Sequence, residues 1–145
     1  MNIAKRNSNI ELIKQQALED LAFFIRLIHP KRLLGACHED LISWMCRSEA
    51  STHQLILMPR DHMKSTLLAY RVAWELTKHP ELRVLYVSST ANLAIKQLKF
   101  IKDVLESKIL QKYWPELIHP EKDKREKWTE SEISVDHPKR KEEGV

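Results

Sequence analysis

The chain has 145 residues, a formal net charge of +4 at pH 7, and a composition that is 43% hydrophobic and 30% charged. These values are typical of one soluble globular domain, and the charge is compatible with a nucleic-acid partner without requiring one. No apolar run approaches the length of a membrane span, and the N-terminus lacks the apolar core of a signal peptide. We therefore expect a cytoplasmic protein with no membrane partner.

The first third of the chain is predicted to be helical. A capping box at residues 8–11 (Ser-x-x-Glu) is expected to open a helix that runs to about Ile28, where His29-Pro30 ends it. A second, shorter helix is predicted over residues 37–47. The apolar face of the first helix is formed by Ile10, Ile13, Ala17, Leu21, Phe24 and Ile28.

The most specific pattern is a strand, a loop and a helix in the middle of the chain. The apolar run 54–58 predicts a short strand, and a helical pattern begins at Lys64 and ends before His79-Pro80. This order is the layout of a phosphate-binding loop, in which main-chain N–H groups and a helix N-terminus meet the phosphates. The segment reads Leu55-Ile56-Leu57-Met58-Pro59-Arg60-Asp61-His62-Met63-Lys64-Ser65-Thr66.

The loop departs from the pattern G-x-x-x-x-G-K-[ST], because Met58 and Met63 stand where the two glycines belong. Glycine is usual there because the backbone approaches phosphate closely and can need a positive φ. Met63 must therefore adopt a conformation that is open to a residue with a side chain, or the loop must be wider than usual. The alternative is an ordinary turn before a helix, with Asp61 as the helix cap.

The residues after the loop favour a nucleotide-binding α/β unit. The run 83–88 is β-branched and aromatic, which is typical of a parallel strand buried on both faces. Ser89-Thr90 is expected to cap a further helix, whose apolar stripe contains Ala94, Leu98, Ile101, Leu105 and Ile109. Crossover helices between strands predict a parallel sheet. We therefore expect 55–58 and 84–88 to be parallel strands joined by a helix over 64–78.

These residues resemble part of a known family. Residues 59–66 resemble the deviant Walker A motif of tailed-bacteriophage terminase large subunits, in which an arginine commonly lies four residues before the lysine, as Arg60 precedes Lys64, and the second glycine is often lost. Residues 84–90 and the apolar stripe that follows look like the second strand and helix of the same ATPase domain. Residues 127–135 are similar to the segment before its third strand. The likeness spans about residues 30–145.

The resemblance implies an α/β fold, namely the front half of an additional-strand P-loop NTPase with parallel strands and crossover helices. It divides the chain into an N-terminal helical segment (1–50), an ATPase core (51–118) and a charged linker or strand (119–145). The motif that supplies an Asp for Mg²⁺ and a Glu for water is not found, because only Ile133 and Val135 are apolar before Asp136. We therefore expect a chain that is truncated before this motif and lacks the family's nuclease domain.

The resemblance also assigns roles within the loop. Lys64 would neutralise the β- and γ-phosphates, Ser65 would bind Mg²⁺, and Thr66 would contact the α-phosphate. Arg60 would reach the γ-phosphate as a finger, or else form a surface salt bridge with Asp61 or Glu81; Lys64 and Arg60 are thus the catalytic candidates. The predicted nucleotide-binding residues are Arg60, Asp61, His62, Met63, Lys64, Ser65 and Thr66.

The implied function of the intact protein is ATP-driven translocation of double-stranded DNA into a procapsid, with ATP and Mg²⁺ as cofactors. Its implied partners are double-stranded DNA, a portal protein, a terminase small subunit and a ring of identical subunits, in the host-cell cytoplasm. The present chain alone is expected to have no ATPase activity and to expose unpaired strand edges and apolar faces. The alternatives are a non-enzymatic remnant, which binds nucleotide weakly or not at all, and a fragment of a helicase-like DNA-dependent ATPase.

Three further groups of polar residues have simpler interpretations. His38 and Glu39 would line an adenine pocket under the resemblance, and exposed helix positions are the alternative that we favour. Cys37 and Cys46 lack a second pair of ligands, so zinc is not predicted. Residues 88–90 (Ser-Ser-Thr) either bind a DNA phosphate or cap a helix, and we favour the cap.

Overall fold

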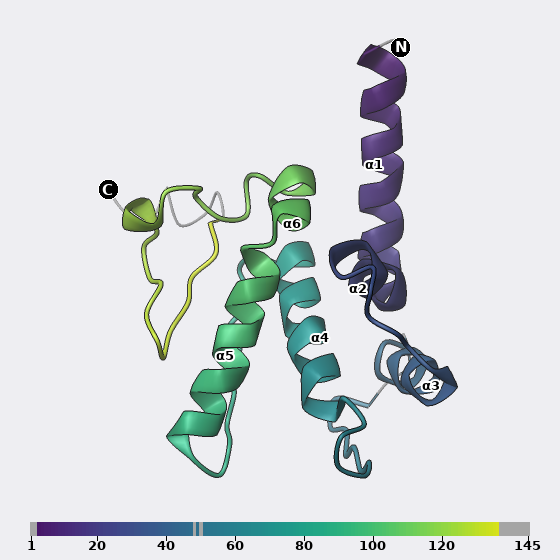
Figure 1. The fold of residues 1–145 in the computed structure, drawn as a ribbon, viewed down its shortest axis with the longest axis vertical. Helices are drawn as coiled ribbons and strands as arrows, with labels where there is room; N and C mark the ends of the chain where they lie inside the picture. The colour runs from purple at the N-terminus through teal and green to yellow at the C-terminus, as the bar shows by residue number, and fades with distance from the viewer. Residues whose placement is uncertain (1–2, 48, 50, 137–145) are drawn as a thin grey trace. The chain divides into compact units, whose positions relative to one another are not determined.

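The computed structural model describes residues 3–47, 49 and 51–136, and these residues are mainly helical (Figure 1). The chain divides into two compact units, Met1–Leu68 and Ala69–Val145, and the division falls inside α4. The part of the predicted C-terminal segment over 137–145 lies outside the described residues. The elements are α1 (Ile3–Glu19), α2 (Leu21–Ile28), α3 (Ala36–Met45), α4 (Lys64–Lys78), α5 (Ala91–Leu105), α6 (Lys108–Tyr113) and the 3-10 helix η1 (Lys122–Lys124).

The predicted α/β fold is wrong, because the described residues contain no strand and no sheet. Residues 55–58 and 84–88, which were predicted as parallel strands, are irregular segments instead. A strand exists only where a second segment takes up its N–H and C=O groups. Within the described part of the chain, no segment does so for 55–57 or 83–88. Among the described residues, Trp128 and Ile133 form an isolated antiparallel bridge.

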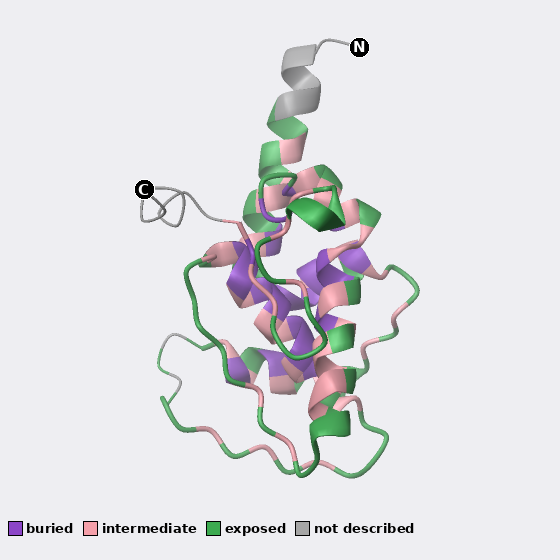
Figure 2. Ribbon diagram, turned by 90° about the vertical axis from the view of Figure 1, so that its left-hand side faces the viewer, coloured by how far each residue is buried: buried purple, intermediate pink, exposed green. Residues whose placement is uncertain are grey.

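Apolar side chains along the two segments are exposed, whereas the run 83–88 was predicted to be a strand buried on both faces. Leu55 and Leu57 are 79% and 81% exposed, and Leu85 and Val87 are 88% and 77% exposed. Figure 2 shows the connecting segments in green and pink, whereas the buried residues in purple are concentrated on the helices. The two segments therefore contribute few of the side chains that form the cores of the units.

The first unit contains α1, α2, α3 and the loop before α4. The sequence predicted one helix from residue 8 to Ile28, but the helix is interrupted at Asp20, and Ser8 lies inside α1 rather than at a cap. The Asp20 carboxylate accepts hydrogen bonds from the N–H groups of Ala22 (2.7 Å) and Phe23 (3.1 Å), which is the N-cap geometry that starts a new helix. The end of α2 at Ile28 agrees with the prediction.

The second unit contains most of α4 together with α5 and α6. The helix over 64–78 is confirmed at both ends, and Thr90 caps α5 as predicted, since its hydroxyl accepts a hydrogen bond from the N–H of Leu93 at 3.3 Å. Tyr70 on α4 is fully buried and meets Phe100 of α5 edge to face, with ring centroids 5.1 Å apart. The connection between α4 and α5 runs back along α5 before that helix begins (Figure 1).

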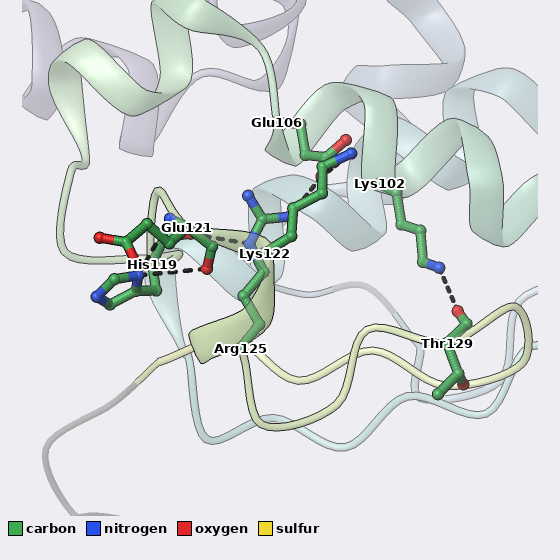
Figure 3. A network of polar contacts seen from close by, with 7 residues as sticks. All are labelled: Lys102, Glu106, His119, Glu121, Lys122, Arg125 and Thr129. Carbon is green, nitrogen blue, oxygen red and sulfur yellow. Dashed lines mark hydrogen bonds and ion pairs between the residues drawn. The ribbon is translucent and has the colours of Figure 1, made fainter.

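A polar network holds the end of α5 to the chain after it (Figure 3). The Arg125 side chain is 3% exposed, donates to the Glu106 carboxylate, and donates through Nε to the His119 carbonyl oxygen at 2.8 Å. Lys122 Nζ lies 3.6 Å from the same carboxylate, and the Arg125 guanidinium lies 4.6 Å from the centre of the Trp128 ring. Burial alone raises the pKa of Glu106, but the Arg125 hydrogen bond and the neighbouring positive charges outweigh it, so the pKa is lowered.

The lowered pKa of Glu106 predicts that acid destabilises the second unit. Because the carboxyl group has a lower pKa in the folded unit than in the unfolded chain, its stabilising contribution is complete above the ordinary pKa of 4.5 and is lost as the pH falls below that value and through the lowered pKa of the folded unit. Urea unfolding at neutral pH and at about pH 3.5 measures this loss. Glu106→Gln is expected to flatten the pH dependence; an equally steep dependence in the variant would contradict the prediction.

Candidate functional site

The candidate site is the loop between residue 58 and the first turn of α4, all within the first unit. α4 begins at Lys64, and the N–H of Leu67 donates to the Met63 carbonyl oxygen at 2.8 Å, which closes the first helical turn. Lys64 is therefore the first helical residue, as the phosphate-loop pattern requires. The predicted position of this lysine relative to the helix is confirmed.

Two residues of the loop have a positive φ. Asp61 has a φ of 64° and Met63 has a φ of 54°, and they are the only non-glycine residues with a positive φ among the described residues. A positive φ is uncommon for residues with a side chain, although Asp tolerates it better than most. Met63 stands where the phosphate-loop pattern has its second glycine, so this position has the left-handed backbone that a glycine adopts without strain.

The sign of φ alternates from Asp61 to Lys64. Asp61 and Met63 have a positive φ, whereas His62, which lies between them, and Lys64, which follows Met63, have a negative φ. When successive residues adopt the right-handed and left-handed backbone conformations in turn, their N–H groups point into one concave surface. This arrangement, called a nest, binds anions. Among the described residues, no hydrogen bond uses the N–H group of Met63, Lys64, Ser65 or Thr66 as its donor. Four adjacent N–H groups at a helix N-terminus therefore have no hydrogen-bond partner among the described residues, as the first N–H groups of a helix commonly do before a ligand binds.

The Lys64 side chain folds back over the loop. Its Nζ donates to the Met58 carbonyl oxygen at 3.3 Å, so the ammonium group spans the loop from the helix start to the residue that ends the apolar run. The His62 ring donates through Nδ1 to the Arg60 carbonyl oxygen at 2.8 Å, which fixes the turn between them. The loop is thus closed by two side-chain-to-backbone hydrogen bonds, and a cation lies on it.

The remaining loop residues are accessible from solvent. Arg60, Asp61 and Ser65 are exposed, and Thr66 is half-buried. Among the described residues of the first unit, Arg60 forms no ion pair, so the predicted alternative of a salt bridge with Asp61 is not found; the alternative with Glu81, a residue of the second unit, stays a prediction. The Asp61 carboxylate accepts no hydrogen bond from a described residue, so it does not cap α4.

The loop suits a triphosphate better than a bare metal ion. Four open N–H groups and an ammonium group are donors for anionic oxygens, whereas Ser65 is the only residue predicted to bind Mg²⁺. Mg²⁺ commonly keeps several waters and takes its other ligands from substrate phosphates, so one hydroxyl suffices when the ion arrives with the nucleotide. No group of three or more His, Cys, Asp or Glu residues suitable for a metal ion occurs among the described residues.

The other candidate residues make local contacts. His38 Nδ1 accepts a hydrogen bond from the N–H of Gly35 at 3.0 Å at the start of α3, and Glu39 pairs with Arg26. Both contacts hold α3 within the first unit and leave the adenine-pocket role without support. Cys37 is exposed and Cys46 is half-buried, and neither forms a disulfide.

The sequence did not predict the positive φ of Asp61 or the bond from Lys64 to Met58. The Asp residue itself was a usable signal, since Asp and Asn are the side-chain residues most often found in the left-handed region. Comparison of the chain with protein families, curated proteins and solved structures finds no match. The terminase resemblance therefore rests on the motif residues alone. None of the helices among the described residues combines the length and apolar character of a membrane span.

Proposed function

We propose that residues 58–66 bind the phosphate groups of ATP with Mg²⁺. The observation that carries this proposal is the alternation of φ from Asp61 to Lys64, which leaves adjacent N–H groups open at the N-terminus of α4. The helix dipole favours a negative charge at the same place. The positive charge of Lys64 is repelled by the partial positive charge at the helix N-terminus, and a bound phosphate compensates both positive charges.

Separate roles follow for the side chains of the loop. The Lys64 ammonium group donates hydrogen bonds to the β- and γ-phosphates. It either gives up its hydrogen bond to the Met58 carbonyl oxygen or keeps that bond beside the new ones. Ser65 is exposed at the first turn of α4 and binds the Mg²⁺ ion that accompanies the nucleotide. Arg60 is exposed and free of ion pairs among the described residues of the first unit, so its guanidinium is available to the γ-phosphate.

We also propose, on the strength of the motif resemblance, that the chain is the ATP-binding portion of a DNA-packaging terminase large subunit. In this role it would serve ATP-driven translocation of double-stranded DNA into a procapsid, together with a portal protein and a small subunit, in the host-cell cytoplasm. Residues 59–66 support this assignment, through Arg60 four residues before Lys64 and the missing second glycine.

Calorimetric titration of the 145-residue chain with Mg-ATP tests the nucleotide proposal. We expect saturable binding to one site, and weaker binding of Mg-AMP because fewer phosphates meet the loop. No turnover above background is expected, because no residue of the described chain is assigned to activate water. Absence of saturable binding would contradict the proposal. ATPase activity that disappears in Lys64→Ala would contradict the expected inactivity.

A further inference from the structure

The segment 83–88 of the second unit has main-chain groups and apolar side chains without a partner. Within the described residues, none of its N–H or C=O groups forms a hydrogen bond, although an extended backbone of this length can form a ladder with another strand. Leu85 and Val87 are 88% and 77% exposed, whereas Tyr86 between them is half-buried. Val84, on the same side of an extended segment as Tyr86, is 46% exposed, so the side with Leu85 and Val87 is the more open of the two.

The segment also forms one wall of a groove of about 640 Å³ within the second unit. Val72 and Leu76 of α4 and the apolar stripe of α5 (Ala94, Ile95, Leu98, Ile101) contribute apolar side chains to its lining, and residues 127–133 contribute polar ones. When a second strand pairs with 83–88, the side chains on one of its faces point toward the molecule. The groove provides space for those side chains. An apolar edge of this kind is a template for strand addition.

We propose that residues 83–88 are the docking surface for a second copy of this chain, through antiparallel pairing of the two segments centred on Tyr86. In a two-fold antiparallel pair, opposite residues lie on the same face. The Tyr86-centred register sets Leu85 of each copy opposite Val87 of the other, so the most exposed side chains cover each other. This interface lies in the second unit, and the inference does not rest on the nucleotide-binding proposal.

Charge supports a second copy as the occupant. Arg83 is the only charged residue of the segment, and the Tyr86-centred register sets it opposite Ser89. No like charges therefore face each other across the pair. Shifting the centre to Leu85 would instead set Arg83 opposite Val87, which leaves one of the apolar side chains against a guanidinium group. The Tyr86-centred register thus pairs the most exposed apolar side chains with each other and sets no like charges opposite each other.

Sedimentation equilibrium of the chain over a range of concentrations, with amide I infrared spectra, tests this interface. We expect a monomer–dimer equilibrium in which the β-sheet signal rises with concentration. The dimer contains two Leu85–Val87 pairs related by its two-fold axis. Leu85→Lys and Val87→Glu each place a charge opposite an apolar residue in both of these pairs, and each is expected to weaken dimerisation at least about tenfold. Both substitutions are at exposed positions, and unchanged helical circular dichroism confirms that the variants fold.

Mixing the two variants tests the register itself. In the mixed dimer, one Lys–Glu pair and one Leu–Val pair replace the mismatched pairs, so dimerisation is expected to recover to within about threefold of the original chain. Leu33→Lys, at a position that is 85% exposed in the first unit, is the matched control and should leave dimerisation unchanged. A concentration-independent monomer, a dimer without added β-sheet signal, or no recovery on mixing would overturn the proposal.

Discussion

Lys64→Ala is expected to weaken Mg-ATP binding by roughly 10- to 150-fold, because a charge-assisted hydrogen bond to phosphate contributes about 1.5–3 kcal/mol. The Lys64 ammonium group already lies over the loop, on the Met58 carbonyl oxygen, so little rearrangement is needed before it meets phosphate. Calorimetric titration of both proteins with Mg-ATP measures the difference.

The matched control for this variant is Lys96→Ala. Lys96 is exposed on α5 and is not part of the loop, so its loss changes the net charge by the same amount without removing a phosphate contact. Equal losses of affinity in the two variants would assign the effect to the overall charge. Unchanged affinity in Lys64→Ala would mean that the loop is a structural turn.

Tyr70→Ala is expected to lower the free energy of unfolding of the second unit by about 3–5 kcal/mol, which is the usual cost of truncating a large buried aromatic residue. Tyr70 is fully buried on α4 and meets Phe100 of α5 edge to face at 5.1 Å, so its removal leaves a cavity between the two helices. Urea unfolding followed by circular dichroism measures the loss.

Tyr113→Ala on α6 is the control, because Tyr113 is only half-buried. This variant is expected to lose clearly less stability than Tyr70→Ala. A loss below about 1 kcal/mol for Tyr70→Ala would show that the contact between α4 and α5 contributes little to the unit.

The sequence predicted helix ends well where they depend on residues close by in the sequence. The start of α4 at Lys64, its end at Lys78 and the cap of α5 at Thr90 follow from local rules for helix ends. The conformation of Met63 differs from the expectation. The sequence predicted a conformation open to a residue with a side chain, or a wider loop, whereas its φ of 54° lies in the left-handed region that favours glycine.

The strands could not be predicted in the same way, because a strand depends on a partner elsewhere in the chain. The β-branched run at 83–88 was predicted as a strand, but composition does not reveal whether another segment takes up its N–H and C=O groups, and among the described residues none does. The single helix predicted over 8–28 failed for a related reason. The apolar stripe continues through Asp20, whereas the carboxylate bonds to the N–H groups of Ala22 and Phe23 and starts a new helix.

The central claim is that the loop before α4 binds phosphate through its main-chain N–H groups. Backbone amide resonances of the ¹⁵N-labelled chain, followed by NMR as Mg-ATP is added, test it most directly. We expect the largest shifts at residues 62–66, with saturation at one equivalent, and the same pattern at reduced affinity in Lys64→Ala. Shifts confined to other parts of the chain, or none at 62–66, would contradict the account.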